Sequence, residues 1–504
     1  MIPLIVAFPL LFAFVVSLIP ALRLQRKLNK PAFLIGIFTP WLFFVVSAKE
    51  MPISEIVGQW SRVSGIEVAL DAYNFYFILA ELILFSLVSL YSLSYFEHRD
   101  INKIYSLILL MHAGLLGAFI SRDLFNYYIY LEIASVAAFA LVGLSSEKGA
   151  KRAAYKYLMF SLIASYFFIF AVGIIYLKTG YLNVTLIKDI ATPSKEISAA
   201  LGVAFTALLL KAGIFPLHFW LPDAHSKAPT PISALLSGIV VKAPIYGMLL
   251  LALTFPLNHA LKTMLFVIAF FSMFFGIVMA LLQKNAKKLL AYHTVSQMGY
   301  ILLGMATLNF HGAIYHAFAH ALFKGGLFLS VGTIVTAQKT KDLDKLSYRG
   351  DKVLMLSILM LSLAIGGISP FIGAFSKKEL LVGLSRSWAY LFQAAGIGTL
   401  ISFMKLNYYM MKPGEVWSTL PRRMVSFAMA ILTLAFGLYF GMSLALKEDF
   451  VAIIGALVVF ISLKKLGVFE LQLKPKFEEN MKGLGVEVNF YSALFAFFLV
   501  LFLL

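Results

Sequence analysis

Long apolar stretches separated by short polar ones run along the whole chain. Most of them are about 20 residues long, the length that an α-helix needs to cross a bilayer. They do not alternate between polar and apolar residues, as strands of a membrane barrel do. The pattern therefore predicts an all-α polytopic membrane protein. Spanning segments are predicted at residues 3–22, 31–49, 73–95, 104–121, 125–145, 154–177, 197–222, 230–254, 261–282, 289–307, 311–336, 353–383, 387–411, 424–444, 449–463 and 488–504.

Composition supports this class and excludes several functions. Of 504 residues, 61% are hydrophobic and 13% are charged, whereas a soluble protein is about half apolar. There are no cysteines, which excludes disulfides, cysteine-ligated iron–sulfur clusters and thiol redox chemistry from this chain. The sequence contains no phosphate-binding loop, no dinucleotide fingerprint and no zinc-protease motif. Any redox chemistry is therefore expected in partner subunits.

Basic residues concentrate on alternate loops. The net charge of +18 is read as basic cytoplasmic loops rather than as a nucleic-acid surface. With the loop after the first segment inside, the acid-rich stretch 50–71 falls outside, and both termini are expected outside. The chain is accordingly placed in the cell (plasma) membrane.

Two spanning segments contain helix-breaking residues. The seventh segment and the turn after it hold Pro216, Pro222, Pro229 and Pro231, and the twelfth holds Gly366, Gly367, Pro370 and Gly373. If residues 104–254 and 261–411 form two five-helix units, each break falls on the fourth helix of its unit. Breaks at matching places indicate an inverted-repeat transporter, flanked here by residues 1–103 and 412–504.

Charged residues stand inside several spanning segments. A charge at the bilayer centre costs roughly 3 kcal/mol or more, so such residues usually mark ion paths. Glu132 is expected to pair with Lys211; the carboxylate favours the charged ammonium, and its withdrawal would release a proton. The alternative for Glu132 is a structural carboxylate. Lys242 has no obvious carboxylate, which suits a proton acceptor; its alternative is snorkelling to the headgroups.

Histidines add candidate proton carriers. His316, His320 and Lys324 recur every four residues and share one helix face, and histidine can shuttle protons near neutral pH. A structural hydrogen bond explains His316 equally well, and a metal site lacks a third ligand. His293 is either an uptake group or an interfacial residue.

Four further charges have less specific predictions. Lys377 and Lys378 are consecutive, so at most one of them points into a central path. Lys405 is a secondary candidate that snorkelling explains better. Glu81 is expected to meet a partner subunit.

Four motifs resemble a known family. They are LLLKAGIFPLHFWLPDAHSKAPTPISALLSGIVVKAPIYG, KKLLAYHTVSQMGYILLG, GAIYHAFAHALFKGGLFL and GGISPFIGAFSKKELL. They resemble the antiporter-like subunits shared by respiratory complex I, Mrp-type Na⁺/H⁺ antiporters and membrane-bound hydrogenases, over roughly residues 70–445. The resemblance implies a 14-helix core with two inverted five-helix repeats, discontinuous helices 7 and 12, and about two extra C-terminal helices.

The resemblance also assigns roles. Glu132 matches the glutamate of the fifth helix, and Lys211 and Lys242 match the lysines of the seventh and eighth. His320 and Lys324 match central polar positions, and Lys377 matches the basic or acidic residue of the twelfth helix. Ser237 departs from one branch, which has histidine there. The long lateral helix of the largest subunit is missing, so the chain is similar to the middle-sized type.

The expected function is a proton-translocating subunit of a redox-driven pump, with a hydrogenase-type complex of a thermophilic archaeon favoured. The alternatives are a subunit of an Mrp-type Na⁺/H⁺ antiporter and a non-conducting spacer. The resemblance implies a polar axis along the membrane plane. In this chain the axis is rich in lysine and poor in carboxylate, which favours protons over sodium as the transported ion. No cofactor or metal is expected in this chain; Fe–S clusters, NiFe or quinone would belong to partners. Expected partners are further antiporter-like subunits, a peripheral redox module and lipid, and no nucleic acid.

Overall fold

The structure is a computed structural model that describes residues 1–19, 28–96, 101–190 and 192–471, with a few helical positions beyond. The predicted segment 488–504 lies almost wholly outside these residues. The helices are α1 (Leu4–Leu18), α2 (Asn29–Ala48), α3 (Phe75–Tyr95), α4 (Ile101–Ile120), α5 (Leu124–Gly143), α6 (Ala150–Thr179), α7 (Val184–Ile190), α8 (Lys195–Ala212), α9 (Leu221–Lys227), α10 (Thr230–Gly238), α11 (Ala243–Thr254), α12 (His259–Leu281), α13 (Ala286–Ala306), α14 (Phe310–Gln338), α15 (Lys352–Gly366), α16 (Ile372–Leu381), α17 (Arg386–Met410), α18 (Leu420–Tyr439) and α19 (Leu446–Lys465).

The predicted class is confirmed. Among the described residues, ten helices are long and apolar enough to cross a membrane, counting α10–α11 as one. Several of the nineteen helices given above begin at a side-chain cap that accepts a hydrogen bond from the first turn. These caps are Asp123 before α5, Ser194 before α8, Asn285 before α13 and Asp351 before α15.

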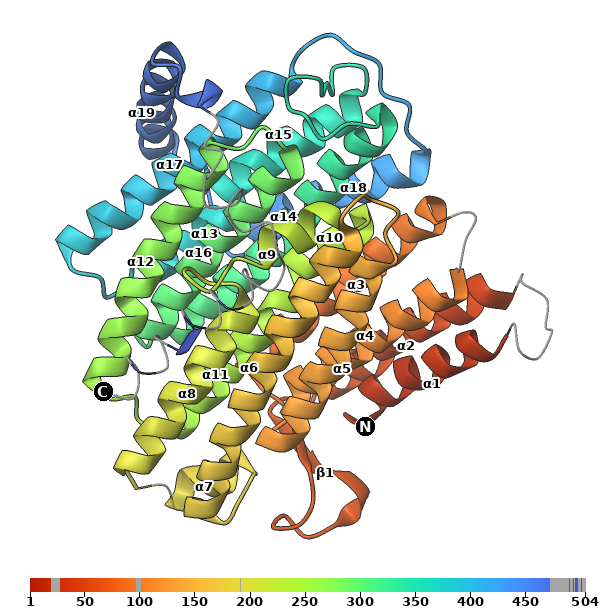
Figure 1. Cartoon of the computed structure of the whole chain (residues 1–504), viewed down its shortest axis with the longest axis vertical. Coiled ribbons are helices and arrows are strands. Elements are labelled where there is room, and N and C mark those ends of the chain that lie inside the picture. Colours follow the sequence, from red (N-terminus) through yellow and green to blue (C-terminus); the bar gives the residue numbers. More distant parts are fainter. Residues whose placement is uncertain are drawn as a thin grey trace.

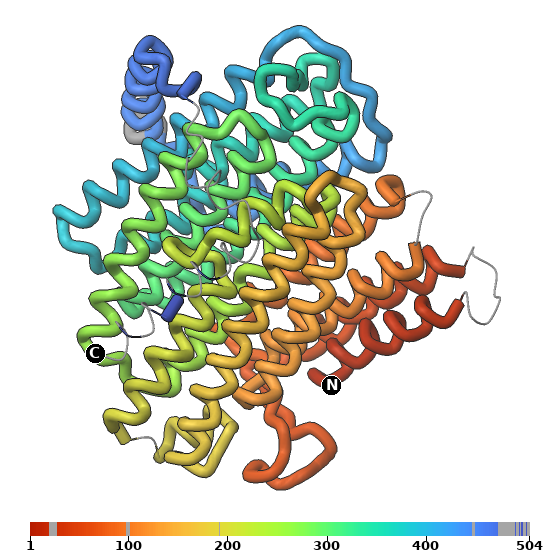
Figure 2. The backbone as a smooth tube through the Cα atoms, viewed as in Figure 1, coloured from red at the N-terminus to blue at the C-terminus, as the bar shows by residue number. Residues whose placement is uncertain are grey.

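The helices form one bundle, in which the later helices α14 and α18 pack back against α3. In Figures 1 and 2 the N-terminal helices α1 and α2 lie at one edge, and α12 and α17 lie toward the other. The spanning parts of α14 and of α10–α11 are wholly buried. Helix α14 packs against α3, α10, α13, α15, α16 and α18, and it therefore forms the centre of the bundle.

The loops gather at two ends. Strands β1 (Ile53–Ile56) and β2 (Glu67–Leu70) form an antiparallel hairpin within the acid-rich stretch 50–71, which was expected to be a loop. Val68 bridges to Ser121, so the loop between α4 and α5 lies at the same end, called here the hairpin end. At the opposite end, the basic end, Glu147 pairs with Lys227 and Lys341. Loops predicted to share a side of the membrane therefore meet in the structure.

The first predicted break is present, although glycine begins it. Helix α8 ends at Gly213, which has a left-handed backbone (φ 65°). The chain is not helical from there to Trp220, a stretch that contains Pro216. Pro222 lies in the first turn of α9, and Pro229 precedes α10, whose first turn holds Pro231. These three prolines start new helices instead of breaking one.

The second predicted break separates α15 from α16. Helix α15 ends at Gly367 (φ 85°), and Pro370 lies in the unwound turn. Gly373 then lies directly against the carbonyl oxygen of Ala364. The second piece therefore folds back close to the end of the first.

A third interruption was not predicted. Helix α10 stops at Gly238, Ile239 has non-helical backbone angles, and the 3-10 turn Val240–Lys242 leads into α11. Gly238 and Pro244 flank this point and were the available sequence signals. Lys242 therefore stands at a break rather than inside a regular helix.

Helix α19 is longer than the predicted segment 449–463. It packs along α17, where Ala456 and Phe460 lie in one apolar cluster with Leu400 and Ile401. The carboxylate of Asp449 accepts a hydrogen bond of 3.1 Å from the backbone of Ser369. This helix therefore contacts the turn between α15 and α16.

We expect Gly373→Ala to destabilise the protein. The added methyl group would overlap the Ala364 carbonyl oxygen, and overpacking of this kind costs about 1–3 kcal/mol. Thermal unfolding of the purified protein measures the loss. Gly396→Ala on α17 is the matched control, since nothing lies within 4 Å of the position of its methyl group. Equal melting temperatures for the two variants would contradict the close packing at the break.

Candidate functional site

A buried ion pair joins α5 to α8. The ammonium of Lys211 lies 2.7 Å from Oε1 of Glu132, and about one fifth of the glutamate side chain remains exposed. Lys211 also donates to the Ser161 hydroxyl at 3.0 Å, and Ser165 donates to Glu132 at 2.5 Å. The predicted contact between Glu132 and Lys211 is thus present, supported by two serines of α6.

A small cavity adjoins this pair. Its lining includes Lys211, Ser135 and Tyr157 on one side, and Val240 and Pro244 on the other. Its volume of ≈ 10 Å³ is about the least that can hold one water molecule. Val240 and Pro244 flank Lys242 in sequence, so the cavity extends from Lys211 toward the interrupted α10–α11 segment.

Lys242 is wholly buried and contacts a histidine. Its ammonium contacts Nδ1 of His320 and the backbone oxygen of Ser237. The opposite ring nitrogen of His320 has no partner. The snorkelling alternative for Lys242 is therefore wrong, because the side chain points into the protein.

Further buried basic residues accompany the Lys242–His320 contact. Lys324 is buried and donates to the Leu290 carbonyl oxygen at 2.5 Å. His293 is also buried, against Phe403 with ring centres 4.8 Å apart, so the interfacial reading of His293 is wrong. His225 on α9, which sequence reasoning missed, is buried, and neither of its ring nitrogens has a hydrogen-bond partner among the described residues. The sequence signal that could have identified His225 is its position close to the helix-breaking Pro222 and Pro229.

His316 connects the centre to the second break. Its Nδ1 lies 2.9 Å from the Ser376 hydroxyl on α16, and its Nε2 lies 3.2 Å from Oε1 of Gln297 on α13. Lys377 follows Ser376 and is buried. Its ammonium donates to the carbonyl oxygens of Ile365 and Gly366, both at 2.9 Å, where α15 ends.

The structure separates the remaining candidates. Lys378 is exposed, so Lys377 is the one of the two that points inward. Lys405 is buried and donates to the carbonyl oxygens of Leu281 (2.5 Å) and Gln283 (2.8 Å). The snorkelling reading of Lys405 is wrong; it caps the end of α12, whose last carbonyls lack helical partners. Glu81 is buried within the chain, so its expected contact with a partner subunit is wrong.

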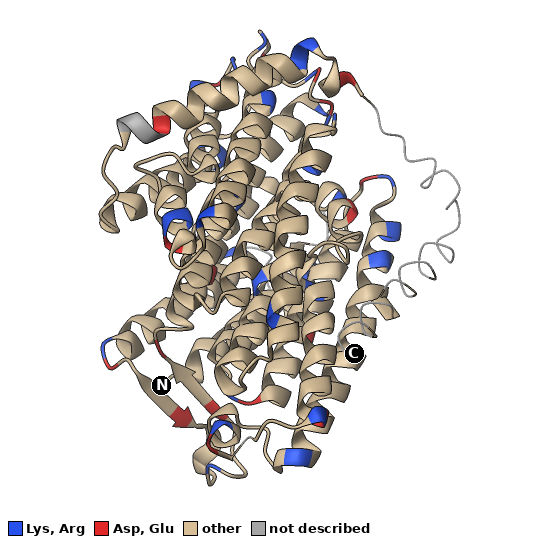
Figure 3. Cartoon of the chain, turned by 90° about the vertical axis from the view of Figure 1, so that its left-hand side faces the viewer, with Lys and Arg blue, Asp and Glu red and all other residues tan. Residues whose placement is uncertain are grey.

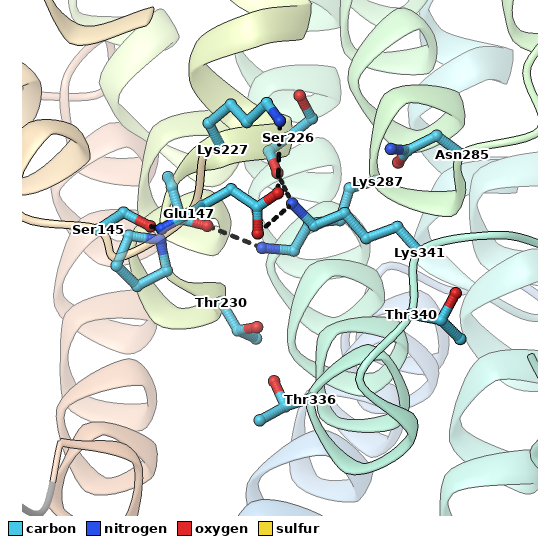
Figure 4. A network of polar contacts seen from close by, with 12 residues as sticks. Ser145, Glu147, Ser226, Lys227, Thr230, Asn285, Lys287, Thr336, Thr340 and Lys341 are labelled. Carbon is cyan, nitrogen blue, oxygen red and sulfur yellow. Dashed lines mark hydrogen bonds and ion pairs between the residues drawn. The ribbon is translucent and has the colours of Figure 1, made fainter. Parts of the chain in front are cut away.

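A polar network covers the basic end (Figure 4). Glu147 lies 3.0 Å from Lys341 and 3.3 Å from Lys227. Burial alone would raise the pKa of Glu147, but the hydrogen bonds and charges of the two lysines hold it below its usual value. Beneath them, buried Lys287 donates to the Ala228 carbonyl oxygen at 2.8 Å. The network therefore ties the α9–α10 turn to the loops after α5 and α14.

In the coloured ribbon of Figure 3, many charged positions lie toward the two ends, and positions of Lys or Arg also occur inside the bundle. Among the described residues, no three of His, Cys, Asp and Glu come together as a metal site would need. Apart from the Glu132 carboxylate, the contacts that the axis lysines make are with hydroxyls, a histidine and backbone oxygens. This arrangement can hold and pass protons.

Comparison with known proteins gives one family. Residues 121–402 match the family described as NADH:quinone oxidoreductase/Mrp antiporter, transmembrane. The chain is 30% identical to the D-type subunit of the Na(+)/H(+) antiporter of Alkalihalophilus pseudofirmus, over 80% of this chain and 86% of that protein. It is 34% identical to the N-type subunit of the NADH-quinone oxidoreductase of Desulforudis audaxviator, over 59% of this chain and 61%, less than two thirds, of that protein.

A solved structure is also similar. A chain of the membrane-bound sulfane sulfur reductase, an archaeal respiratory membrane complex, superposes with a TM-score of 0.80 at 25% identity. The match covers 93% of this chain and 99% of the other.

We expect the Glu147 network to stabilise the protein in a pH-dependent way. Because the folded pKa of Glu147 lies below the unfolded one, its contribution is complete above the unfolded value, about 4.3, and is lost as the pH falls through the folded value. At pH 7, Glu147→Gln should lower the melting temperature slightly, since partly exposed pairs contribute at most about 1 kcal/mol.

The difference between wild type and Glu147→Gln should shrink as the pH falls below about 4. Glu415→Gln is the control, because that exposed carboxylate, at the same end, forms no ion pair among the described residues. A difference that stays constant with pH would contradict the assignment.

Proposed function

The chain belongs to the family of NADH:quinone oxidoreductase and Mrp antiporter membrane subunits, and on that premise we propose that it carries protons. It is an antiporter-like subunit of a complex I-related, hydrogenase-type or Mrp complex. Our proposal is a redox-driven pump, with the redox groups in partner subunits. The observation that carries it is the Glu132–Lys211 pair at one end of a series of buried lysines and histidines.

Glu132 and Lys211 form the gate of this path. With the carboxylate at 2.7 Å, the ammonium keeps its proton; when the carboxylate moves away, the buried charge loses its main stabilisation and the proton is released. The partly exposed side of Glu132 allows that movement to be caused by a neighbouring subunit. The adjoining cavity, with room for one water, leads the proton toward Lys242.

Lys242 and His320 continue the transfer. The amine and the ring nitrogen are in contact, so a proton can pass between them without a water. Lys324 keeps positive charge at the centre, and repulsion between like charges in a low-dielectric interior is several-fold stronger than in water. His316, between Ser376 and Gln297, leads to Lys377. His293, Lys378 and Lys405 have at most secondary roles.

Lys377 is the release site. The carbonyl oxygens at the end of α15 hold its ammonium, and the C-terminal end of a helix carries partial negative charge. The proton leaves on the hairpin side, which we place outside together with both termini. The basic end then faces the cytoplasm of a plasma-membrane complex. Units 104–254 and 261–411 act as two inverted repeats around this path, flanked by residues 1–103 and 412–504.

A second candidate is an exchanger unit that also moves sodium. The similarity to the D-type subunit of an antiporter favours it. The axis offers one carboxylate, Glu132, which already binds a lysine, whereas a hard cation prefers several oxygen ligands. Protons therefore remain our choice, and sodium-dependent transport by the purified protein would favour the exchanger.

We expect Lys211→Ala and Glu132→Gln each to reduce proton pumping by about tenfold or more. Each variant removes one partner of the pair that holds and releases the proton, and each 1.36 kcal/mol added to the barrier for proton transfer lowers the rate tenfold. Pumping is measured in vesicles and normalised to the amount of assembled complex. Glu196→Gln is the control, because the 2.9 Å pair of Glu196 with Lys178 is exposed. Normal pumping by the assembled double variant would contradict the proposal that Glu132 and Lys211 gate the path.

Lys377→Ala and Lys378→Ala should behave differently. The buried Lys377 is placed on the path, whereas the exposed Lys378 is not. We therefore expect the first variant to lose proton pumping and the second to retain most of it, with the same vesicle assay. Full pumping in both variants would favour a non-conducting spacer, because a spacer needs neither lysine for transport.

A further inference from the structure

A second buried acid–base pair lies outside the path described above. Oε1 of Glu81 on α3 lies 2.6 Å from Nδ1 of His112 on α4, and neither side chain is exposed. The His112 ring stacks on Phe85 with centres 4.7 Å apart. Within the described part of the chain, the outer atoms of the pair, Oε2 of Glu81 and Nε2 of His112, have no hydrogen-bond partner.

The pair lies at the depth of the break that carries Lys242. On α3, Phe77 contacts the ring of Tyr246, and Leu84 lies against Gly238. Glu81 lies between these two positions of α3, which places it level with the residues between Gly238 and Tyr246 on the facing segment.

The α4 side gives the same depth. Leu115, one turn after His112, lines the cavity that Lys211 and Val240 share. Leu84 also lies against Gly325, the residue after Lys324. The pair is therefore next to the centre of the proposed path, on the side of α3 and α4.

A purely structural cross-link between two helices does not explain the unpartnered atoms. Each buried polar atom without a partner destabilises the folded protein by about 1–3 kcal/mol. If the pair served only to join α3 to α4, apolar residues at these two positions would therefore give a more stable protein. Two free atoms at opposite ends of one hydrogen bond are instead what a proton relay requires.

We propose that Glu81 and His112 form a further proton-binding site of the transport machinery, beside the Lys242 break. A proton arriving at Nε2 of His112 allows the ring to release the proton on Nδ1 to Oε1 of Glu81; the N–H bond breaks as the O–H bond forms. The carboxyl group then rotates about its Cγ–Cδ bond, which carries the protonated oxygen to the side that Oε2 had faced, and the O–H bond breaks there as the proton leaves. No oxidant or co-reactant takes part, and the net charge of the pair rises by one while it holds the extra proton.

Among the described residues, the elements packed against α3 and α4 carry Tyr127 and Glu132 on α5, Tyr246 on α11, His320 and Lys324 on α14, Arg422 on α18 and Glu67 on β2, and Lys242 stands between α10 and α11. Lys242, Lys324 and His320 can be positive, so a proton on the pair would favour its departure from Lys242. This inference rests on the proposed proton path.

Glu81→Gln in the assembled complex is the test. The glutamine oxygen can still accept the hydrogen bond from Nδ1–H but cannot take up a proton. We expect the pumping rate to fall by about 100-fold, since a positioned acid–base group contributes about that much or more to proton transfer. The pH profile of the remaining activity should also lose one titration step. Ser92→Ala is the control, because its buried hydroxyl only bonds to Val88 of its own helix.

The outcomes separate this inference from the proposed function. Normal rate and pH profile in Glu81→Gln, with Lys211→Ala inactive, would overturn the relay and leave the main path standing. Normal pumping in Lys211→Ala would overturn the main path itself. If Glu81→Gln lowers assembly, the exchanged variant Glu81→His with His112→Glu restores the pair; recovered pumping supports the relay, and recovered assembly without pumping overturns it.

Discussion

A lysine ammonium inside a membrane bundle must have hydrogen-bond partners, and for several of the buried lysines these partners are carbonyl oxygens where a helix ends or is interrupted. A regular helix uses nearly all of its carbonyl oxygens internally, whereas a helix end leaves its last four free. Lys377 binds the free carbonyls where α15 ends, and Lys405 binds those where α12 ends. Lys242 contacts the Ser237 carbonyl beside the interruption of α10. The helix ends and interruptions therefore supply hydrogen-bond acceptors for these buried lysines.

Lys211 differs from these lysines because its partner is a side chain. A backbone carbonyl is fixed by the fold, whereas the Glu132 carboxylate can change rotamer and remains partly exposed. A neighbouring subunit can therefore alter the charge balance at Lys211 without unfolding a helix. The serines Ser161 and Ser165 keep both charged groups hydrogen-bonded in the closed arrangement.

The sequence predicted what local chemistry determines. Apolar length fixed the main spanning helices, and clustered glycine and proline located both predicted breaks. It could not predict that Gly213 ends α8, that the chain breaks again at Ile239, or that residues 53–70 pair as a hairpin, because each depends on packing against distant segments.

The same limit explains the errors at Lys405 and Glu81. Their partners, at Leu281 and His112, lie far away in sequence, and hydropathy alone cannot separate a side chain near the headgroups from one that caps a neighbouring helix.

The two predicted breaks hold their lysines in opposite ways. Lys211 lies in the last turn of α8, before the break, and faces a side-chain carboxylate on another helix. Lys377 lies after its break, on α16, which folds back so that the ammonium reaches carbonyls of α15. In the proton path that we propose, a partner that is a side chain can be moved by a change of rotamer, whereas backbone carbonyls stay in place. Control of that path therefore belongs at the Lys211 end, and Lys377 responds to the charge that arrives from the centre.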